Sequence, residues 1–417
     1  MTPGEPAAYR LFEVVGLELE YPVVDRELRP QCLVEPAFRL LHGRPTSDVE
    51  FDNVGFSNEL AAHVFEIKTV HPQPTLERAE RQLVSGLGRF QRLLHEEFDA
   101  RLLPTGMHPF MRPNQTTLWP RAGRRIYRTY DRIFGVRGHG WLNVQASHVN
   151  LPFGTEAETV RLHNAIACLL PYLPALTASS PIYEGKIGPY VDNRLAFYRT
   201  TQKRIPIVTG DVIPEFVDSF RDYRNRILKR IYRTLDDVPG GNVIQHEWVN
   251  SRGAIVRFMR RAIEIRVLDT QECVKADVAV AVYVRAVLRW MVHAMEKEET
   301  PLPPHAALVR DFDRVIRHGR NANVEAPHVG RRHASRRIPA AEVLGWLLDR
   351  ARAEVSHEER PYLGLVADRL REGNLSERIA QRVRRVAPRG GARRRDAIRR
   401  TYEELADCLE RNVLWPG

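Results

Sequence analysis

The sequence has few cysteines. Its four, at positions 32, 168, 273 and 408, lie far apart and form no C-x-x-C pair. Their spacing argues against a disulfide framework and against a cysteine zinc site, and it favours reduced thiols. The first residues also lack the basic and apolar segments of a secretory signal. We therefore expect a cytoplasmic protein.

Long apolar runs without charge are absent as well. The longest apolar stretch, residues 278–295, contains Arg285 and Arg289 and follows Lys275 and Asp277. Charged side chains are costly in the hydrocarbon core of a membrane, so the stretch favours a buried helix over a membrane span. We expect no membrane partner.

Several motifs of nucleotide-binding proteins and hydrolases are missing. No G-x-x-x-x-G-K-[ST] phosphate loop occurs, and "GLGRF" is too short for a dinucleotide fingerprint. No G-x-S-x-G marks a serine hydrolase, and "HEER" at residue 357 lacks the second histidine of a zinc protease. A nucleotide site in this chain must therefore be of another type.

Positive charge is in excess and partly concentrated. The net charge is +11 and the isoelectric point is near 9.7, which admits nucleic acid or another polyanion as a ligand. Much of the excess lies in residues 378–400, "RIAQRVRRVAPRGGARRRDAIRR". For this segment we favour a solvated helical face or a connector over a nucleic-acid footprint.

Strand and helix patterns interleave irregularly along the chain. Hydrophobic patterns predict strands at 12–24, 63–70, 141–152, 243–249, 254–258 and 262–268. Helical periodicity predicts helices at about 33–42, 76–99, 157–172, 216–235 and 274–297. Because several strands have only one apolar face, we expect an α+β fold with a largely antiparallel sheet flanked by helices.

A proline-rich stretch, "EKEETPLPPH" at residues 296–305, ends this sheet-bearing part. The chain beyond it has helical patterns, at 339–355, 362–373 and 394–412. We therefore expect a main domain in residues 1–299 and a helical C-terminal region in residues 300–417 that packs on it.

Three predicted strands combine an apolar face with a face that carries glutamate. Glu18 and Glu20 alternate with apolar residues in "VGLELEY", as do Glu66 in "FEIKTV" and Glu264 in "IEIRVLD". Each strand alone is explained by solvation of one face. Together they predict a sheet face of carboxylates, which repel one another unless cations neutralise them. Mg²⁺ or Mn²⁺ does this with oxygen ligands that it shares with phosphate.

Six strings occur in a fixed order: "VGLELE", "FEIKT", "GMHPF", "LPALTASSPIYEGKIG", "FYRT" and "IEIRVLDTQE". They resemble glutamate–cysteine ligase family 2, the carboxylate–amine ligases, over about residues 12–292, and "RHGRNANVEAP" extends the likeness into the tail. The resemblance implies a glutamine synthetase-like fold, whose curved antiparallel sheet holds metals and ATP on its concave face. It also implies ATP-dependent amide formation through an acyl phosphate, catalysed by residues 1–299.

Transferred position by position, the resemblance implies a site for Mg²⁺ or Mn²⁺ on the glutamate-rich strands. The implied metal ligands are Glu18, Glu20, Glu59, Glu66, His148 and Glu264. Glu59 stands seven residues before Glu66 and is matched less directly. Where the family often carries two histidines, this chain has Ala146 and His148. A structural, hydrogen-bonded role for His148 stays open beside the ligand role.

The resemblance also implies roles for basic residues. Arg266 would be catalytic together with Glu264, because its guanidinium fork offers fixed donors to the γ-phosphoryl group of ATP. An ion pair between the two is the alternative. Arg199 in "FYRT" resembles a contact to ATP or substrate, although a surface arginine would fit as well. His108 in "GMHPF" would touch substrate or cap a loop.

The chain departs from the family where substrates are expected to bind. The W-W-D-x-R-P stretch before the last strand is replaced by "HEWVNSRGAIVRF", in which Trp248 and Arg252 are partial stand-ins. Arg252 is therefore a further candidate for substrate binding. The resemblance implies glutamate as the acid and cysteine as the default amine. Another small-molecule amine or a peptide terminus stays open as the acceptor.

Other functions and partners are weighed against this one. The same fold supports guanidino phosphotransfer, for which Cys273 could be proposed as the reactive thiol, but a buried residue at a helix start is the plainer interpretation. A non-catalytic protein could use residues 378–400 to bind nucleic acid or an acidic partner, yet such a protein would gain nothing from the carboxylates. A homo-oligomer is compatible with an exposed sheet edge.

Overall fold

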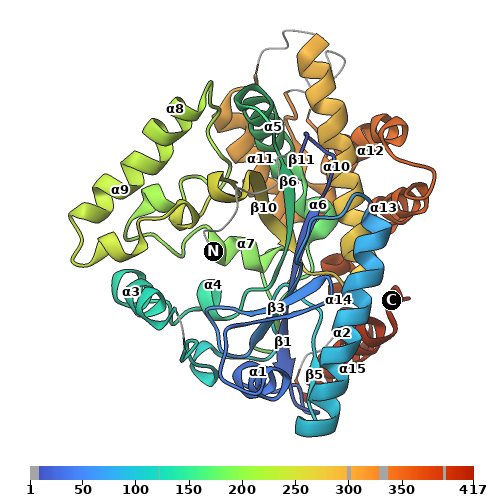
Figure 1. Cartoon of the computed structure of the whole chain (residues 1–417). Helices are drawn as coiled ribbons and strands as arrows, with labels where there is room; N and C mark the ends of the chain where they lie inside the picture. The colour runs from blue at the N-terminus through green and yellow to red at the C-terminus, as the bar shows by residue number, and fades with distance from the viewer. Residues whose placement is uncertain (1–8, 122, 298–301, 328–336, 388–390) are drawn as a thin grey trace.

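The computed structural model describes residues 9–121, 123–297, 302–327, 337–387 and 391–417. Its main strands are β1 Gly16–Val24, β2 Asp48–Phe51, β3 Val54–Asn58, β4 Val64–Thr69, β5 Arg101–Leu102, β6 Ala146–Pro152, β9 Ala254–Arg257 and β10 Ala262–Asp269. They form an antiparallel sheet in the order β2-β3-β4-β1-β6-β10-β9, and β5 pairs with the end of β1. The sheet crosses the middle of the molecule, with helices on both sides (Figure 1). The predicted α+β class is confirmed.

The apolar face of the sheet packs on two long helices, α2 (Leu76–Phe98) and α10 (Val274–Lys297). Alternation in β1 buries Leu17 and Leu19 on this face. Helix α2 begins where the side chain of Thr75 accepts a hydrogen bond from a first-turn amide, and it presents a row of buried leucines. The opposite, polar face of the sheet is thereby left for other elements.

Helix α10 is the core helix of the molecule. By length and hydropathy it could cross a membrane, yet 72% of its most apolar window is buried inside the protein. It contacts α2, α5 (Glu156–Leu169), α12 (Ala340–Ala351) and α13 (Arg360–Glu372). A helix with apolar residues on most of its circumference is stable in water only when other elements pack against most of its surface. The buried helix expected from the sequence is what the structure shows.

Shorter helices stand on the polar side of the sheet, on the left in Figure 1. They are α3 Arg124–Phe134, α4 His139–Leu142, α7 Asn193–Tyr198, α8 Phe220–Tyr223 and α9 Lys229–Asp236. Two further helices are α1 Val34–His42 and α6 Pro174–Thr177. Two small strand pairs are β7 Ile182–Tyr183 with β8 Lys186–Ile187, and β11 Asn323–Val324 with β12 Ile338–Pro339. The polar face is thus bordered by helices instead of being open to solvent.

The C-terminal helices lie against the sheet-bearing part. They are α11 His305–His318, α12, α13, α14 Leu375–Val386 and α15 Ala392–Arg411. Two buried ion pairs join them to it, Arg369 with Glu272 and Glu359 with Arg285. The predicted boundary at residue 299 lies outside the described residues. The arginine-rich segment falls on α14 and α15, and residues 388–390 within it are also outside them.

One predicted strand is wrong, and two other predicted elements differ in detail. Residues 243–249 form no strand but two short turns, η5 (Gly241–Ile244) and η6 (Glu247–Val249), because Gly240 turns the chain with a φ of +70°. The predicted helix at 216–235 is present from Phe220 to Asp236, and its middle, η4 (Arg224–Leu228), is π-helical between α8 and α9. Strand β6 begins only at Ala146, since residues 139–142 form α4.

Candidate metal and nucleotide site

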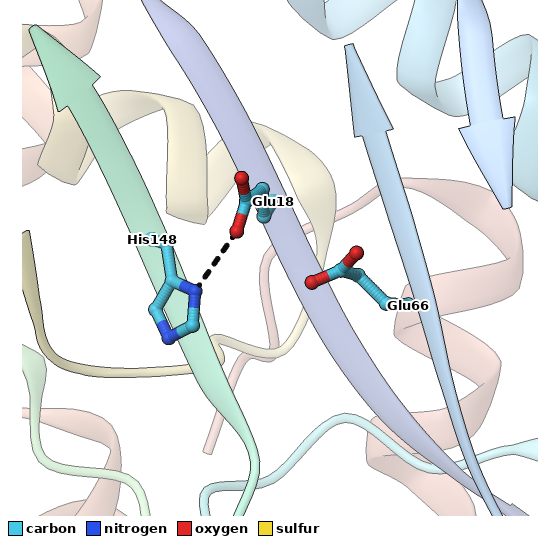
Figure 2. Close-up of side chains that lie close together, drawn as sticks. All are labelled: Glu18, Glu66 and His148. Carbon is cyan, nitrogen blue, oxygen red and sulfur yellow. Dashed lines mark hydrogen bonds and ion pairs between the residues drawn. The ribbon is translucent and has the colours of Figure 1, made fainter. Parts of the chain in front are cut away.

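Carboxylates from three strands meet on the polar face of the sheet. In the register, Glu20 lies opposite Glu66, and Glu18 lies opposite His148. Glu264 of β10 lies opposite Asn150 on the intervening strand β6. Figure 2 shows Glu18, Glu66 and His148 gathered from three adjacent strands. Antiparallel pairing therefore brings side by side residues that are remote in sequence.

These side chains line a pocket of about 320 Å³, the carboxylate pocket. Its predicted residues are Glu18, Glu20, Glu59, Glu66, His148, Glu264 and Arg266. The other lining residues are Lys68, Val144, Ala146, Arg194, Tyr198, Arg257 and Arg260. All six predicted metal ligands are thus in one place, although their binding of metal stays a prediction.

Two groups in the carboxylate pocket have the spacing of a metal site. The ligand atoms of Glu18, Glu66 and His148 lie within 4.8 Å of one another, and so do those of Glu20, Glu59 and Glu66. Glu66 belongs to both groups. Carboxylate oxygens are the ligands that Mg²⁺ and Mn²⁺ prefer, so the residues present fit the implied cations.

Burial and clustering raise the pKa values of three of the five carboxylates. Burial, with the charge of Glu66, raises the pKa of Glu20 to about 7, even though the amide of Ala146 donates to its Oε2 at 2.8 Å. Burial and the neighbouring carboxylates also raise the pKa of Glu59 and of Glu66. A bound divalent cation would remove the repulsion that causes these shifts.

His148 is a hydrogen-bond partner of the cluster in this structure. Its Nδ1 lies 3.1 Å from Glu18 Oε2, and its Nε2 lies 3.8 Å from Glu20 Oε1. Burial lowers the pKa of His148, but the hydrogen bond to Glu18 and the charges of Glu20 and Glu264 outweigh it and raise the pKa to about 9. The imidazole must lose that proton before it can bind a metal.

Glu264 lies between two arginines. Arg266 donates to its Oε1 from Nε at 2.9 Å, and Arg257 donates to its Oε2. Although burial alone would raise it, these guanidinium groups and the charge of His148 hold the pKa of Glu264 far below its usual range. The ion pair weighed above for Arg266 is therefore present in this structure, and it does not exclude contact with phosphate.

Five polar residues of the carboxylate pocket received no role from the sequence. Lys68 donates to Ser57 Oγ at 2.7 Å and lies 3.3 Å from Glu66 Oε1. The sequence could have indicated this position, because Lys68 stands two residues after Glu66 and therefore lies on the same face of the strand. Arg257 and Arg260 lie at the turn between β9 and β10. Their place in the pocket could be assigned only once the pairing register of these two strands was known. The two remaining residues come from α7, and nothing in the sequence connects that helix with the sheet.

Three residues predicted to bind substrate do not line the carboxylate pocket. Arg199 follows α7 and pairs with Asp313 at 3.0 Å, as a partly exposed arginine. Arg252 is buried and forms two charged hydrogen bonds with Glu215. His108 is buried, and its Nδ1 accepts hydrogen bonds from two backbone amides, which makes it a loop cap. In each case a partner outside the pocket holds the side chain.

Cys273 offers no reactive thiol. It is fully buried just before α10, and burial raises the pKa of its thiol well above the ordinary value. A nucleophilic thiol needs a lowered pKa and access to substrate. The guanidino phosphotransfer alternative therefore gains no support from this residue.

Comparison with known sequences gives matches over most of the chain. The sequence model of glutamate–cysteine ligase family 2 matches residues 14–404. An uncharacterised protein from Archaeoglobus fulgidus is 37% identical over 402 residues, which are 96% of this chain and 100% of that protein. A Rubrobacter xylanophilus protein, named as a candidate glutamate–cysteine ligase 2-3, is 28% identical over 81% of this chain and 84% of its own length.

Solved structures share the fold at low sequence identity. Glutamate–cysteine ligase from Francisella tularensis, in complex with AMP, has a TM-score of 0.58 at 13% identity over 95% of this chain and 90% of that one. A bifunctional glutathione synthetase from Pasteurella multocida has a TM-score of 0.62 at 14% identity, over 95% of this chain and 53% of that one. The expected ligase fold is confirmed.

Proposed function

Because the chain belongs to glutamate–cysteine ligase family 2, we propose that the carboxylate pocket is the active site of an ATP-dependent carboxylate–amine ligase. An oxygen of the acid attacks the γ-phosphorus of ATP, the bond to the β-phosphate oxygen breaks, and ADP leaves. The amine nitrogen then attacks the acyl carbon of the resulting acyl phosphate. Phosphate leaves, the nitrogen loses a proton, and an amide is formed.

One observation carries the proposal, the convergence of Glu18, Glu66 and His148 beside Arg266 in a single pocket. Phosphoryl transfer depends on positioning and charge neutralisation more than on a protein nucleophile. A divalent cation held by these side chains would neutralise phosphate oxygens of ATP. The pocket thus supplies the components that this chemistry requires.

The arginine near the metal ligands has a defined task in the proposal. Glu264 anchors the Arg266 guanidinium through two hydrogen bonds to one carboxylate oxygen. A guanidinium held in this way can donate from its remaining N–H groups to the transferring γ-phosphoryl group without reorganising. Glu264 would therefore act on phosphate through Arg266, and on the cation directly if its second oxygen is released by Arg257.

Glutamate is the proposed acid, and cysteine or another amine, including a peptide terminus, is the proposed acceptor. The names of the relatives support glutamate and cysteine. The substrate residues expected from the family do not line the carboxylate pocket, so we propose that further groups in this pocket bind the acid and the amine. Arg194 and Tyr198 of α7 line the pocket and are the proposed replacements. A cytoplasmic location and a homo-oligomeric state stay predictions.

Release of ADP tests the proposed activity. The protein is incubated with Mg-ATP, glutamate and a panel of amino acids, amines and short peptides, with and without chelator. We expect ADP release that needs both the metal and one particular acid–amine pair. Glu18→Gln and Glu264→Gln should each lower the rate by at least about 10²-fold, because charge stabilisation in the transition state is lost.

A matched control separates activity from folding. Glu96→Gln removes a carboxylate from the exposed side of α2 and should change neither rate nor melting temperature. Full activity in both Glu18→Gln and Glu264→Gln would refute the site. No metal-dependent ADP release with any pair, together with tight binding to polynucleotide, would favour the non-catalytic alternative.

A further inference from the structure

Helix α3 carries four exposed arginines, Arg124, Arg125, Arg128 and Arg132, which we call the arginine strip. None of their side chains forms a hydrogen bond or an ion pair with another described residue. Two exposed arginines that flank the helix, in contrast, each have a carboxylate partner, Arg121 in Glu35 at 2.9 Å and Arg137 in Asp131 at 3.3 Å. The strip is therefore a set of uncompensated positive charges.

The arginine strip is unfavourable for the helix that carries it. Arg124, Arg128 and Arg132 follow one another at intervals of four residues, where like charges repel along a helix. Arg124 and Arg125 also lie in the first turn, where the helix dipole disfavours positive charge. No acidic residue in this turn offsets them. A local conflict of this kind is expected where a ligand supplies the missing charge.

The arginine strip lines two pockets. One, of about 500 Å³, is formed by all four arginines with η5, and its lining contains no carboxylate. The other, of about 420 Å³, shares Arg124 and Arg128 and is walled by Trp119 and Tyr127. Its one carboxylate, Asp131, is paired with Arg137 at 3.3 Å. Both volumes lie in the range of small-molecule sites.

The turn opposite α3 leaves space for one arginine of the strip. A Cβ atom on Gly240 would lie 2.2 Å from Nη2 of Arg132, and Gly240 has a φ of +70°. The positive φ favours glycine at this position. The turn at Gly240 and the end of the Arg132 side chain are therefore in close contact along the larger pocket.

The arginine strip and the carboxylate pocket are neighbours. Tyr127 lines the smaller arginine pocket, and its hydroxyl accepts a hydrogen bond from Asn58 Nδ2 at 3.1 Å. The next residue, Glu59, lines the carboxylate pocket. One hydrogen bond and one peptide unit thus connect the two walls. A single bound molecule can reach from one region toward the other.

We propose that the arginine strip binds the anionic tail of the acid or the amine that the carboxylate pocket joins. This substrate carries at least two carboxylate or phosphate groups beyond its reacting group. Guanidinium forks match both kinds of anion. The inference rests on the proposed ligase function. A nucleic acid fits less well, because the adjacent carboxylates repel an extended polyanion and the pockets are concave.

Binding without turnover tests this inference. Titration calorimetry, without ATP or metal, measures the affinity for tetraglutamate, inorganic tripolyphosphate and free glutamate. We expect one polyanionic probe to bind at least about tenfold more tightly than glutamate, and the probe that does so distinguishes carboxylate from phosphate. Arg124→Gln/Arg128→Gln should weaken that probe by about tenfold or more. Melting temperature checks that this variant of exposed residues stays folded.

A control variant removes the same charge elsewhere. Arg384→Gln/Arg385→Gln changes two exposed arginines of α14 that also form no ion pair with another described residue, and it should bind the probe as the unaltered protein does. Equal losses in both variants would overturn the inference, as would two probes that bind no better than glutamate. The inference would also be overturned if Arg124→Gln/Arg128→Gln lost binding to single-stranded RNA or to Mg-ATP but kept its affinity for the probe.

The outcomes separate this inference from the proposed function. A protein that binds the probe through the arginine strip but never releases ADP refutes the ligase and with it the role of the bound anion as a substrate tail. An active ligase whose KM values for acid and amine are unchanged in Arg124→Gln/Arg128→Gln refutes the arginine strip alone. An active ligase whose KM for one of the two substrates rises about tenfold, with kcat retained, supports both.

Discussion

Glu264 and Glu59 are chemically opposite members of one pocket. Arginines hold the first as a stable anion, whereas the Glu59 side chain has no hydrogen bond to a described residue, and its pKa is raised. Residues of one type therefore serve different purposes according to their neighbours. The strand pattern placed Glu264, and the family resemblance placed Glu59, among the predicted metal ligands, but only the neighbouring side chains show which of them anchors an arginine.

The geometry of Arg266 leads to the first prediction. Arg266→Lys keeps the charge but loses the fork that Glu264 orients, so kcat for ADP release should fall about 10²-fold. Arg260→Lys is the control, because Arg260 is more exposed and reaches only Glu18, at 3.3 Å. Full activity of Arg266→Lys would show that only its charge matters, and equal losses in both variants would show that the effect is not specific to the fork of Arg266.

Asp277 gives a prediction on pH and stability. Its carboxylate is buried in α10, accepts hydrogen bonds from Ser147 and from the amide of Gln271, and has a pKa that burial raises to about 8. From about pH 4 to about pH 8 the folded protein holds a proton that the unfolded chain has lost. The free energy of unfolding should therefore fall with rising pH, by at most about 1.4 kcal/mol per unit from this group.

Asp277→Asn removes this titration and should flatten the slope. Urea unfolding of both proteins at several pH values across that window measures the difference. Parallel slopes would contradict the raised pKa of Asp277.

At the scale of elements, helix α2 shows how closely helix and sheet approach. A Cβ on Gly86 would lie 2.6 Å from Val54 Cγ2 and 3.2 Å from Ile67 Cδ1. Gly86→Ala should therefore destabilise the protein by about 1–3 kcal/mol, because α2 must move away from β3 and β4. In an isolated helix the same change would be stabilising.

Gly88 on the same helix is the matched control for Gly86. Its Cβ would meet only the end of the flexible Arg92 side chain, at 3.7 Å. Gly88→Ala should stabilise the protein, by up to about 1 kcal/mol. Chemical unfolding measures both variants, and a stabilising effect at both positions would show that α2 does not pack on the sheet as described.

Strands with one polar face were predictable, and turns that depend on packing were not. β1, β4 and β10 alternate clearly, so their carboxylates could be assigned to one face from the sequence. The hairpin β2–β3 was missed, although the pair Asp52–Asn53 between two short runs is a turn signal. The false strand at 243–249 has suitable apolar residues, but Gly240 and Gly241 divert the chain.

The candidate site was predictable to a similar extent. Five of the six proposed metal ligands lie on strands, which fix the direction of their side chains, whereas Glu59 follows β3 and came from the family resemblance alone. The arginine strip and the pocket residues of α7 came only from the structure, since the packing of one helix against another segment leaves no short-range pattern. His108, which lies in a loop and was assigned from a family string, is held by hydrogen bonds from neighbouring backbone amides.

For the whole molecule, a buried ion pair joins the C-terminal helices to the end of the sheet. Glu272 is fully buried, and Arg369 of α13 is its cationic partner. Burial alone would raise the pKa of Glu272, but the charge of Arg369 and the hydrogen bond from it hold that pKa below its usual range. The family predicted from six strings is confirmed over residues 14–404, which include both partners.

Arg369→Met should therefore destabilise the protein by about 3–5 kcal/mol, because it leaves a buried carboxylate without its cation. Glu272→Met combined with Arg369→Met should recover most of that loss. Unfolding midpoints of the two single variants and the double variant measure the coupling. Additive losses would show that the pair does not join the two regions.

The central position of α10 has a consequence for synthesis of the chain. Its outer side is covered by α12 and α13, which follow it in sequence. Translation of the last hundred or so residues takes on the order of 10 s. During that time one apolar side of α10, a helix of membrane-span length, is exposed on the nascent chain. Chaperones and the membrane-insertion machinery would compete for this exposed helix until α12 and α13 have been synthesised and pack on it.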